Sequence, residues 1–274
     1  MKTKRIRTAS CVALSALALG STASAELVHR YSFSETDGTT VKDSVGTANG
    51  EIKGYGAFFS GTTLTLPGLT SSSDPADIIA GYVDLPNHII NVLTDATFET
   101  WVIWDATGVA WQRIFDFGTS AGGEDQSNGN GSYIFLSPQG DTNIRFALRD
   151  PATGAEPTQA TAGAPLETGV EVCLTVVYNY TGKVAQLYSN GVVIASAPVS
   201  VDLKAIDDVN NWLGRSQWGD PMFQGSYDEF RIYTTALTGP QVAASYLSGT
   251  EKVATDLSAL GAQQALHLNL AKTT

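Results

Sequence analysis

Short runs in which apolar and polar residues alternate, separated by Gly, Asn, Asp, Ser and Thr, constrain the fold of this 274-residue chain most. In the run 144–149, every second residue is a large apolar one: Ile144, Phe146 and Leu148 alternate with Arg145, Ala147 and Arg149. Because successive side chains of a strand lie on opposite faces, a period of two predicts half-buried β-strands. The same pattern predicts strands at 27–33, 57–66, 98–104, 113–117, 133–137, 170–178, 210–215 and 223–233.

The connections between these runs favour an all-β fold. Asn190 and Gly191 predict a tight hairpin turn, because both tolerate positive φ. Segments 69–80 and 150–165 are predicted to be surface loops. Thr238 and Gln241 have the spacing of a capping box, which predicts a short helix over 242–247 that ends at Gly249. A dozen strands with one helix predict a two-sheet antiparallel jelly-roll sandwich.

The first 25 residues have the pattern of a secretory signal peptide, with four basic residues, a short apolar run and a small-residue cleavage site. We expect cleavage before Glu26 and export to the extracellular space or periplasm. The domain is expected to span 26–249, followed by a loosely attached or disordered tail over 250–274. The C-terminus shows no anchor sequence.

The charge balance excludes some partners. The formal net charge is −11, and cleavage would remove four basic residues and no acidic one. Such a surface repels nucleic acid and anionic lipid headgroups, and it suits solubility and divalent cations. Cleavage would also leave Cys173 as the one cysteine, so no intrachain disulfide is expected.

One carboxylate stands out in the predicted strand 223–233. Strict alternation places Asp228 on the same face as Phe230 and Ile232. A carboxylate on an apolar face is costly unless it is paired, hydrogen-bonded or bound to a metal. Asp228 is therefore a candidate functional residue.

Several motifs, in this order, resemble the laminin-G-like jelly-roll family of the concanavalin A-like lectin and glucanase superfamily: His29-Arg-Tyr-Ser-Phe33, Asp43-Ser-Val-Gly46, Ala48-Asn-Gly50, Tyr82-Val-Asp-Leu-Pro86 and Trp111-Gln-Arg-Ile-Phe-Asp-Phe-Gly118. The resemblance runs from Leu27 to about Gly249. It implies a jelly roll of the secreted bacterial type that binds carbohydrate or mediates adhesion. One departure is Val172-Cys173, where relatives often have Trp-His.

The resemblance also implies one structural Ca²⁺ where an early loop meets the last strand. The matching oxygen donors are Asp43, Asn49 and Asp228. Calcium takes six to eight oxygen ligands, so backbone carbonyls and water would have to complete the shell. The alternative is that Asp43 holds an Asx turn and Asp228 accepts hydrogen bonds from loop amides.

Sugar-binding modules use a flat aromatic ring beside polar groups, and Trp111 and Trp218 are the candidates. Their polar neighbours Arg113, Gln217 and Asp220 complete the predicted ligand set. The alternative is that these tryptophans are core residues, as expected for Trp101 and Trp104. Arg113 and Asp116 lie on opposite faces of the predicted strand 113–117, so they are not expected to pair.

Catalytic motifs are missing from the sequence. Glucanases of this superfamily need carboxylates at i, i+2 and i+4 on one strand, and the chain has no Glu-x-Asp-x-Glu array. Its three histidines form no spaced pair, which argues against zinc. We therefore expect a secreted, non-catalytic module that binds a polysaccharide or cell-surface glycan. The alternatives are an extracellular matrix or adhesion protein that binds another protein, and a glycan lyase or hydrolase of the same fold.

Overall fold

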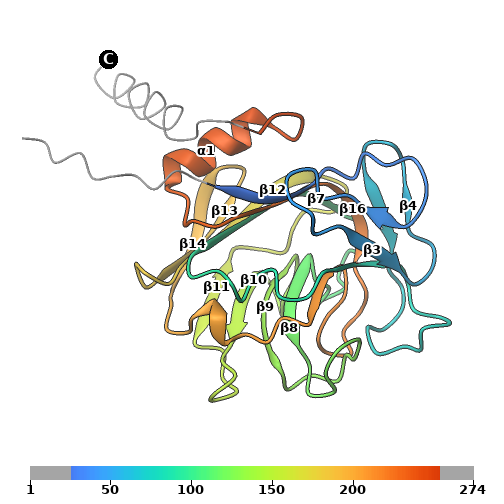
Figure 1. The fold of residues 1–274 in the computed structure, drawn as a ribbon, viewed down its shortest axis with the longest axis horizontal. Coiled ribbons are helices and arrows are strands. Elements are labelled where there is room, and N and C mark those ends of the chain that lie inside the picture. Colours follow the sequence, from blue (N-terminus) through green and yellow to red (C-terminus); the bar gives the residue numbers. More distant parts are fainter. Residues whose placement is uncertain (1–25, 254–274) are drawn as a thin grey trace, which may run out of the picture.

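The computed structural model describes residues 26–253, which form two antiparallel sheets packed face to face (Figure 1). Sheet A has the spatial order β14 (Val192–Pro198), β13 (Val184–Ser189), β12 (Glu171–Asn179), β7 (Ala96–Trp104), β16 (Gln224–Tyr233), β5 (Leu64–Pro67) and β4 (Phe58–Phe59), and β1 (Leu27–Tyr31) also pairs with β16. Sheet B has the order β11 (Thr158–Ala162), β10 (Ile144–Arg149), β9 (Ser132–Ser137), β8 (Phe115–Thr119), β15 (Asn210–Leu213), β6 (Tyr82–Leu85), β3 (Gly50–Lys53) and β2 (Thr40–Val41). The predicted jelly-roll sandwich is confirmed.

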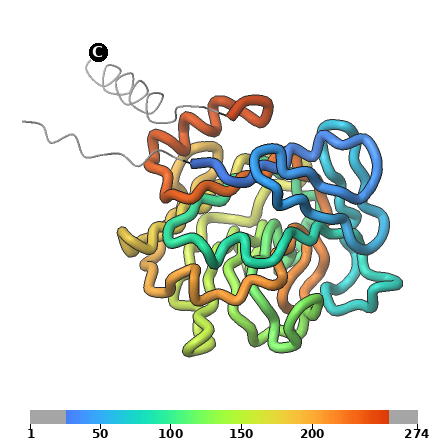
Figure 2. Tube along the Cα trace, viewed as in Figure 1, coloured from blue at the N-terminus to red at the C-terminus, as the bar shows by residue number. Residues whose placement is uncertain are grey.

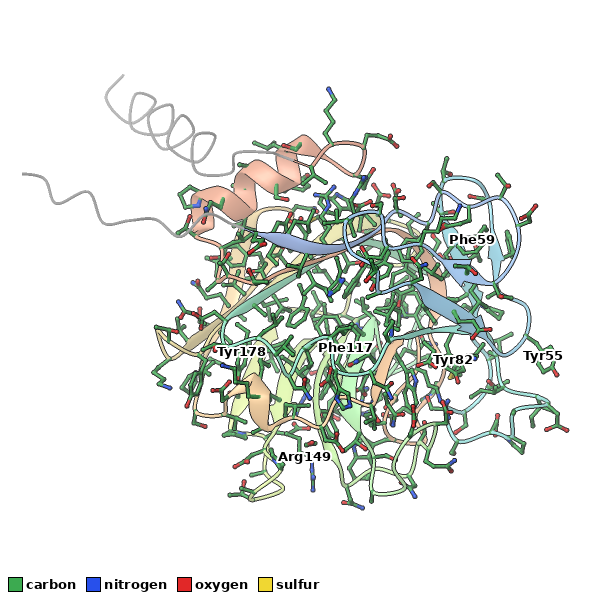
Figure 3. All side chains as sticks on the ribbon, viewed as in Figure 1. Tyr55, Phe59, Tyr82, Phe117, Arg149 and Tyr178 are labelled. Carbon is green, nitrogen blue, oxygen red and sulfur yellow. The ribbon has the colours of Figure 1, made fainter. Side chains whose placement is uncertain are left out.

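The core lies between the sheets and is built from the alternating apolar residues. Phe98 of sheet A and Phe115 of sheet B have ring centroids 5.3 Å apart. Figure 3 shows Phe117 and Tyr178 between the two layers, whereas Arg149 points away from the sandwich. Burial of each such apolar side chain contributes about 1.5–3 kcal/mol, and this term drives the two sheets together.

Two predicted boundaries are wrong. Segment 57–66 is not one strand but the hairpin of β4 and β5, because Ser60 forms a turn in which its Oγ accepts a hydrogen bond from the Thr63 amide at 3.0 Å. Loop 150–165 contains β11, whose inward residues are small and give little apolar signal. The hairpin at Asn190 and Gly191 is confirmed, with φ values of 49° and 77°.

A β-bulge interrupts β16 between Tyr227 and Glu229. The extra residue is Asp228, so Tyr227 returns to the inner face with Phe230 and Ile232, and all three are fully buried. The prediction that Asp228 shares a face with Phe230 and Ile232 is therefore wrong. Asp228 is half-exposed and lines an outer pocket beside Glu229 and Thr250.

The predicted helix is confirmed as α1 (Gly239–Ser248), which covers the outer face of sheet A (Figure 1). Its capping box is formed, with the Thr238 amide donating to Gln241 Oε1 at 2.8 Å. A short 3₁₀ helix, η1 (Leu203–Ala205), precedes β15. None of the helices in the described residues is long and apolar enough to cross a membrane.

A buried ion network fixes both ends of the domain. Arg231 lies between two carboxylates, with Nη1 3.3 Å from Glu99 Oε2 and Nε 2.7 Å from Glu229 Oε1. Glu99 also accepts a 2.6 Å hydrogen bond from Ser245 of α1, and Glu229 pairs with Arg30 of β1 at 2.6 Å. Figure 2 shows the first strand beside the C-terminal helix, where this network joins them.

We predict that Arg231→Met strongly destabilises the protein. The change leaves Glu99 and Glu229 buried without their shared cation, and breaking a buried pair in this way costs about 3–5 kcal/mol. Urea unfolding measures the loss. The control is Lys53→Met, which breaks the exposed Lys53–Glu51 pair and should change stability by no more than about 1 kcal/mol. Equal effects of the two substitutions would contradict this assignment.

Candidate functional site

The outward face of sheet B is polar and aromatic rather than apolar. Asp116 of β8 lies opposite Phe135 of β9 on one side and Trp212 of β15 on the other. Phe135 in turn lies opposite Ala147 of β10. The α-helix of the described residues covers the other sheet (Figure 1), and the loops that carry Trp111 and Trp218 lie against this face. It is therefore the face on which a ligand surface can form.

Two of the predicted residues pack against the same cluster on this face. Trp111 and Trp218 are both half-buried and pack against the cluster that contains Tyr133 and Phe135. The Trp218 indole Nε1 donates a 2.8 Å hydrogen bond to the Tyr133 hydroxyl, which fixes the ring. We call Trp111, Trp218, Tyr133 and Phe135 the aromatic cluster.

Trp111 is held in an unusual backbone conformation. Its φ is +68°, in the left-handed region that bulky L-residues rarely adopt and that costs about 1–3 kcal/mol. Two hydrogen bonds fix it there: its amide donates to the Gln139 carbonyl at 2.7 Å, and its carbonyl accepts from Arg113 Nη1 at 2.6 Å. Strain of this kind persists where the surrounding structure requires one side-chain position.

Arg113 is buried beneath the aromatic cluster. Its guanidinium lies 4.1 Å from the Phe135 ring centroid, and it pairs with Asp116 at 3.2 Å and Asp220 at 2.8 Å. The prediction that Arg113 and Asp116 do not pair is wrong, because β8 begins only at Phe115 and strand alternation does not extend back to Arg113. Arg113 is 2% exposed, so it positions the surface residues and does not itself face a ligand.

Gln217 is also fully buried and has a positioning role. Its amide donates to Asp116 Oδ2 and its side-chain Nε2 to the Asn210 carbonyl, both at 3.0 Å. Asp220 is half-exposed and accepts from Arg113 and, at 2.7 Å, from Ser216. Of the five predicted ligand residues, Trp111, Trp218 and Asp220 therefore reach the surface.

Sequence reasoning missed two charged members of the site. The Arg145 guanidinium lies 5.3 Å from the Trp111 ring centroid and pairs with Glu156. Glu156 also accepts a 3.3 Å hydrogen bond from the Tyr133 hydroxyl. Arg145 could have been found, since alternation in 144–149 already places it on the outward face. Glu156 could not, because it belongs to a loop whose path the sequence does not reveal.

Asp116 is the most perturbed carboxyl group of the site. It is fully buried, and burial raises its pKa to about 7 despite the opposing effect of Arg113. Its Oδ2 accepts from Arg113 and the Gln217 amide, whereas its Oδ1 has no partner among the residues described. Asp116 ties β8 to the loop that carries Trp218.

A cavity of about 540 Å³ adjoins the aromatic cluster. Tyr82 and Arg215 line it, together with residues of the loops 73–76 and 125–128. Gly129, the next residue along the second loop, lies directly against the Trp218 ring, so that a Cβ atom would overlap the indole. The cavity and the aromatic cluster are thus joined through one loop.

The predicted calcium donors are arranged differently from a metal site. The Asp43 carboxylate accepts five hydrogen bonds, one from His29 Nδ1 at 2.7 Å and four from backbone amides at 2.9–3.2 Å. Asn49 Oδ1 accepts from the Asp43 amide at 2.9 Å. The carboxylate oxygens of Asp43 already have their donors, so Asp43 does not fit a calcium ion, whereas Asn49 Oδ1 has a single donor.

The third predicted donor belongs to a different environment. Asp228 contacts Glu171, and its pKa is raised first by burial and then by neighbouring charge from Glu251. Within residues 26–253, no three His, Cys, Asp or Glu side chains are grouped to hold a metal ion. The geometry favours the Asx turn at Asp43, and calcium binding stays a prediction of the resemblance alone.

Two antiparallel sheets packed face to face define a jelly-roll sandwich domain. The family model of the concanavalin A-like lectin/glucanases superfamily matches residues 77–243, and the chain belongs to this superfamily. No curated protein sequence matches the chain.

Solved structures share the fold at low sequence identity. Domain 4 of AbnA, an extracellular arabinanase of glycoside hydrolase family 43 from Geobacillus stearothermophilus solved with arabinotriose, is 23% identical, with 81% of this chain and 98% of that chain covered and a TM-score of 0.61. The sialidase of Trypanosoma rangeli is 13% identical, with 84% and 34% covered and a TM-score of 0.59. The Ruminococcus gnavus carbohydrate-binding module CBM40, bound to α2,3-sialyllactose, is 16% identical, with 66% and 96% covered and a TM-score of 0.49. At these identities the likeness to the arabinanase domain and to the sialidase shows the fold alone.

We predict that mild acid stabilises the protein. Burial raises the pKa of Asp116 to about 7 and that of Asp84 to about 6. A carboxyl group whose pKa is higher in the folded state binds more protons when folded, so its contribution to stability falls as pH rises from about 4 to about 7. The free energy of unfolding in urea should be higher at about pH 5 than at about pH 8.

Two variants test whether Asp116 causes this pH dependence of stability. Asp116→Asn should reduce the difference between the two pH values, whereas Asp77→Asn, at an exposed loop position, should leave it unchanged. Stability that increases with pH over this range would contradict the assignment.

We predict that calcium does not change the unfolding temperature. Calcium present at 100 times its Kd would stabilise the folded state by about 2.7 kcal/mol. Because the Asp43 oxygens already accept hydrogen bonds from the protein, we expect no such stabilisation. Thermal unfolding with EDTA and with CaCl₂ measures this. If CaCl₂ raises the unfolding temperature of the wild type but not that of Asp43→Asn, the metal site that the resemblance implies would be established instead.

Proposed function

We propose that this protein is a secreted, non-catalytic module that binds polysaccharide on the outward face of sheet B. The observation that carries the proposal is that two half-buried tryptophans, Trp111 and Trp218, pack against one cluster. A flat aromatic ring covers the apolar face of a sugar, and neighbouring polar groups bind its hydroxyls. Arg145, Glu156 and Asp220 supply such groups at the edge of the cluster.

Preorganisation supports this reading. Buried Arg113 holds Trp111 through its carbonyl and Asp220 through its carboxylate, so the surface is set before any ligand arrives. A surface that needs no ordering loses less conformational entropy on binding. The fold shared with the arabinanase domain, whose structure contains arabinotriose, agrees with a carbohydrate ligand class.

The alternative of a glycan hydrolase rests on one feature, the pair of Asp116 and Asp220 around Arg113, with the Asp116 pKa raised to about 7. A general acid must reach the glycosidic oxygen. Asp116 is fully buried and cannot do so. We therefore expect no release of reducing sugar from any polysaccharide that the protein binds. If the wild type releases reducing sugar and Asp116→Asn does not, the protein is a hydrolase instead.

A protein partner is the second alternative. Val192, Val193 and Ile194 of the edge strand β14 are exposed, and an exposed apolar edge strand is a surface on which another protein can pair. This edge belongs to sheet A, away from the aromatic cluster. A protein ligand bound there would leave the tryptophan surface unexplained, and for this reason glycan binding is the function we propose.

We predict that Trp218→Ala and Trp111→Ala each lower the affinity for the bound polysaccharide by about tenfold or more, the equivalent of about 1.4 kcal/mol for a lost aromatic contact. Isothermal titration calorimetry with soluble arabinan, xylan, β-glucan and mannan provides the measurement. Phe58→Ala is the control, because Phe58 is an exposed aromatic residue of β4, which belongs to the other sheet. Affinity unchanged in both tryptophan variants would refute the site.

A further inference from the structure

The cavity beside the aromatic cluster contains a buried cation without an anion. Arg215 is 6% exposed, and its guanidinium lies 4.1 Å from the Trp212 ring centroid and 4.8 Å from that of Tyr82. The two other buried arginines, Arg113 and Arg231, each pair with two carboxylates. Arg215 forms no ion pair with any residue that the structure describes, although a buried charge ordinarily requires one.

Arg215 retains donors for a ligand. Its bonds run to the carbonyls of Ser72 at 3.2 Å and Asp125 at 3.0 Å, to Ser127 Oγ at 3.1 Å and to the Tyr82 hydroxyl at 2.7 Å. These use three of its five N–H groups, which leaves one on each terminal nitrogen. The Tyr82 hydroxyl accepts from Arg215 and so keeps its own proton to donate.

The rim of the cavity supplies acceptors. Asp125 and Gln126 lie on the exposed loop, and neither side chain forms a hydrogen bond within the part of the chain described. Asp125 has a φ of +61° that holds it in a fixed turn. Donors at the floor and acceptors at the rim match the alternating donor and acceptor character of sugar hydroxyls.

The charges around the cavity decide which sugars fit. Lys53 and Arg215 are opposed by Asp74 and Asp125, and Lys53 is already paired with Glu51. These four charged side chains sum to zero, so the lining has no net positive charge to attract an acidic sugar, and the chain as a whole, with its net charge of −11, repels one.

We propose that this cavity is a second subsite for a neutral sugar residue, bound through its hydroxyls to Arg215, Tyr82 and Asp125. The ligand is then a neutral oligosaccharide that extends from Trp218 over the exposed side of the loop 125–130 into the cavity. This inference rests on the proposed glycan-binding function and specifies its ligand class. The volume of about 540 Å³ lies within the range of small-molecule sites, about 300–1,000 Å³.

The test blocks the cavity without removing any hydrogen bond. Ala76 is exposed and lines the cavity, so Ala76→Trp should fill it, and Ala152→Trp on the exposed loop after β10 is the matched control. Substitution of Arg215 itself would disturb the fold, because four groups depend on its donors. Thermal unfolding first establishes that both tryptophan variants fold as the wild type does.

Calorimetry then uses oligosaccharides of increasing length from the best-bound neutral polysaccharide, with oligogalacturonate as the acidic probe. We expect Ala76→Trp to lower affinity for the longer oligosaccharides about tenfold and to leave the shortest unchanged, and we expect no affinity for oligogalacturonate. If Ala76→Trp binds oligosaccharides of every length with the affinity of the wild type, the second subsite is overturned while the proposed function stands. Preference for oligogalacturonate would overturn the neutral class. Absence of binding by every glycan would overturn the proposed function itself.

Discussion

The ion pairs of Arg113 under the aromatic cluster are the interaction on which the ligand surface depends. One guanidinium contacts Asp116 on the sheet, Asp220 on the loop and the carbonyl of Trp111. A charge this deeply buried is costly unless it is paired, and the pairing of Arg113 fixes three separate segments in one arrangement. The half-exposed tryptophans then sit on a rigid base.

The outer faces of the two sheets differ in what covers them. The outer face of sheet A is closed by α1 and by the network of Arg231, Glu99 and Glu229, which stabilises the chain ends. Within the described residues, the outer face of sheet B carries no α-helix (Figure 1), and it presents aromatic and polar side chains. Buried arginines lie at both sheets, Arg231 at sheet A and Arg113 and Arg215 at sheet B.

The fold could be predicted from the sequence because strand alternation and turn residues are local signals. The inward residues of β10 and the turn at Asn190 follow directly from them. The bulge at Asp228 could not be predicted, since one inserted residue reverses the side-chain pattern without changing composition.

The site could be predicted only in part. Trp111 and Trp218 were found as aromatic residues among polar neighbours, whereas burial of Arg113 and Gln217 depends on long-range packing. Arg215 and Tyr82 come together from β6 and the segment after β15, which are 133 positions apart in sequence, and no local pattern links them. The aromatic cluster and the cavity are therefore properties of the fold and not of any one motif.

The most direct test of glycan binding by this face is two-dimensional ¹⁵N–¹H NMR of the tryptophan indoles during titration with a neutral oligosaccharide. The account predicts that the Nε1–H signals of Trp111 and Trp218 shift together and saturably. The signal of Trp104, whose Nε1 donates to Gln112 in the core at 2.7 Å, should stay in place. Saturable binding that leaves both Trp111 and Trp218 unshifted would contradict the account and place the ligand elsewhere.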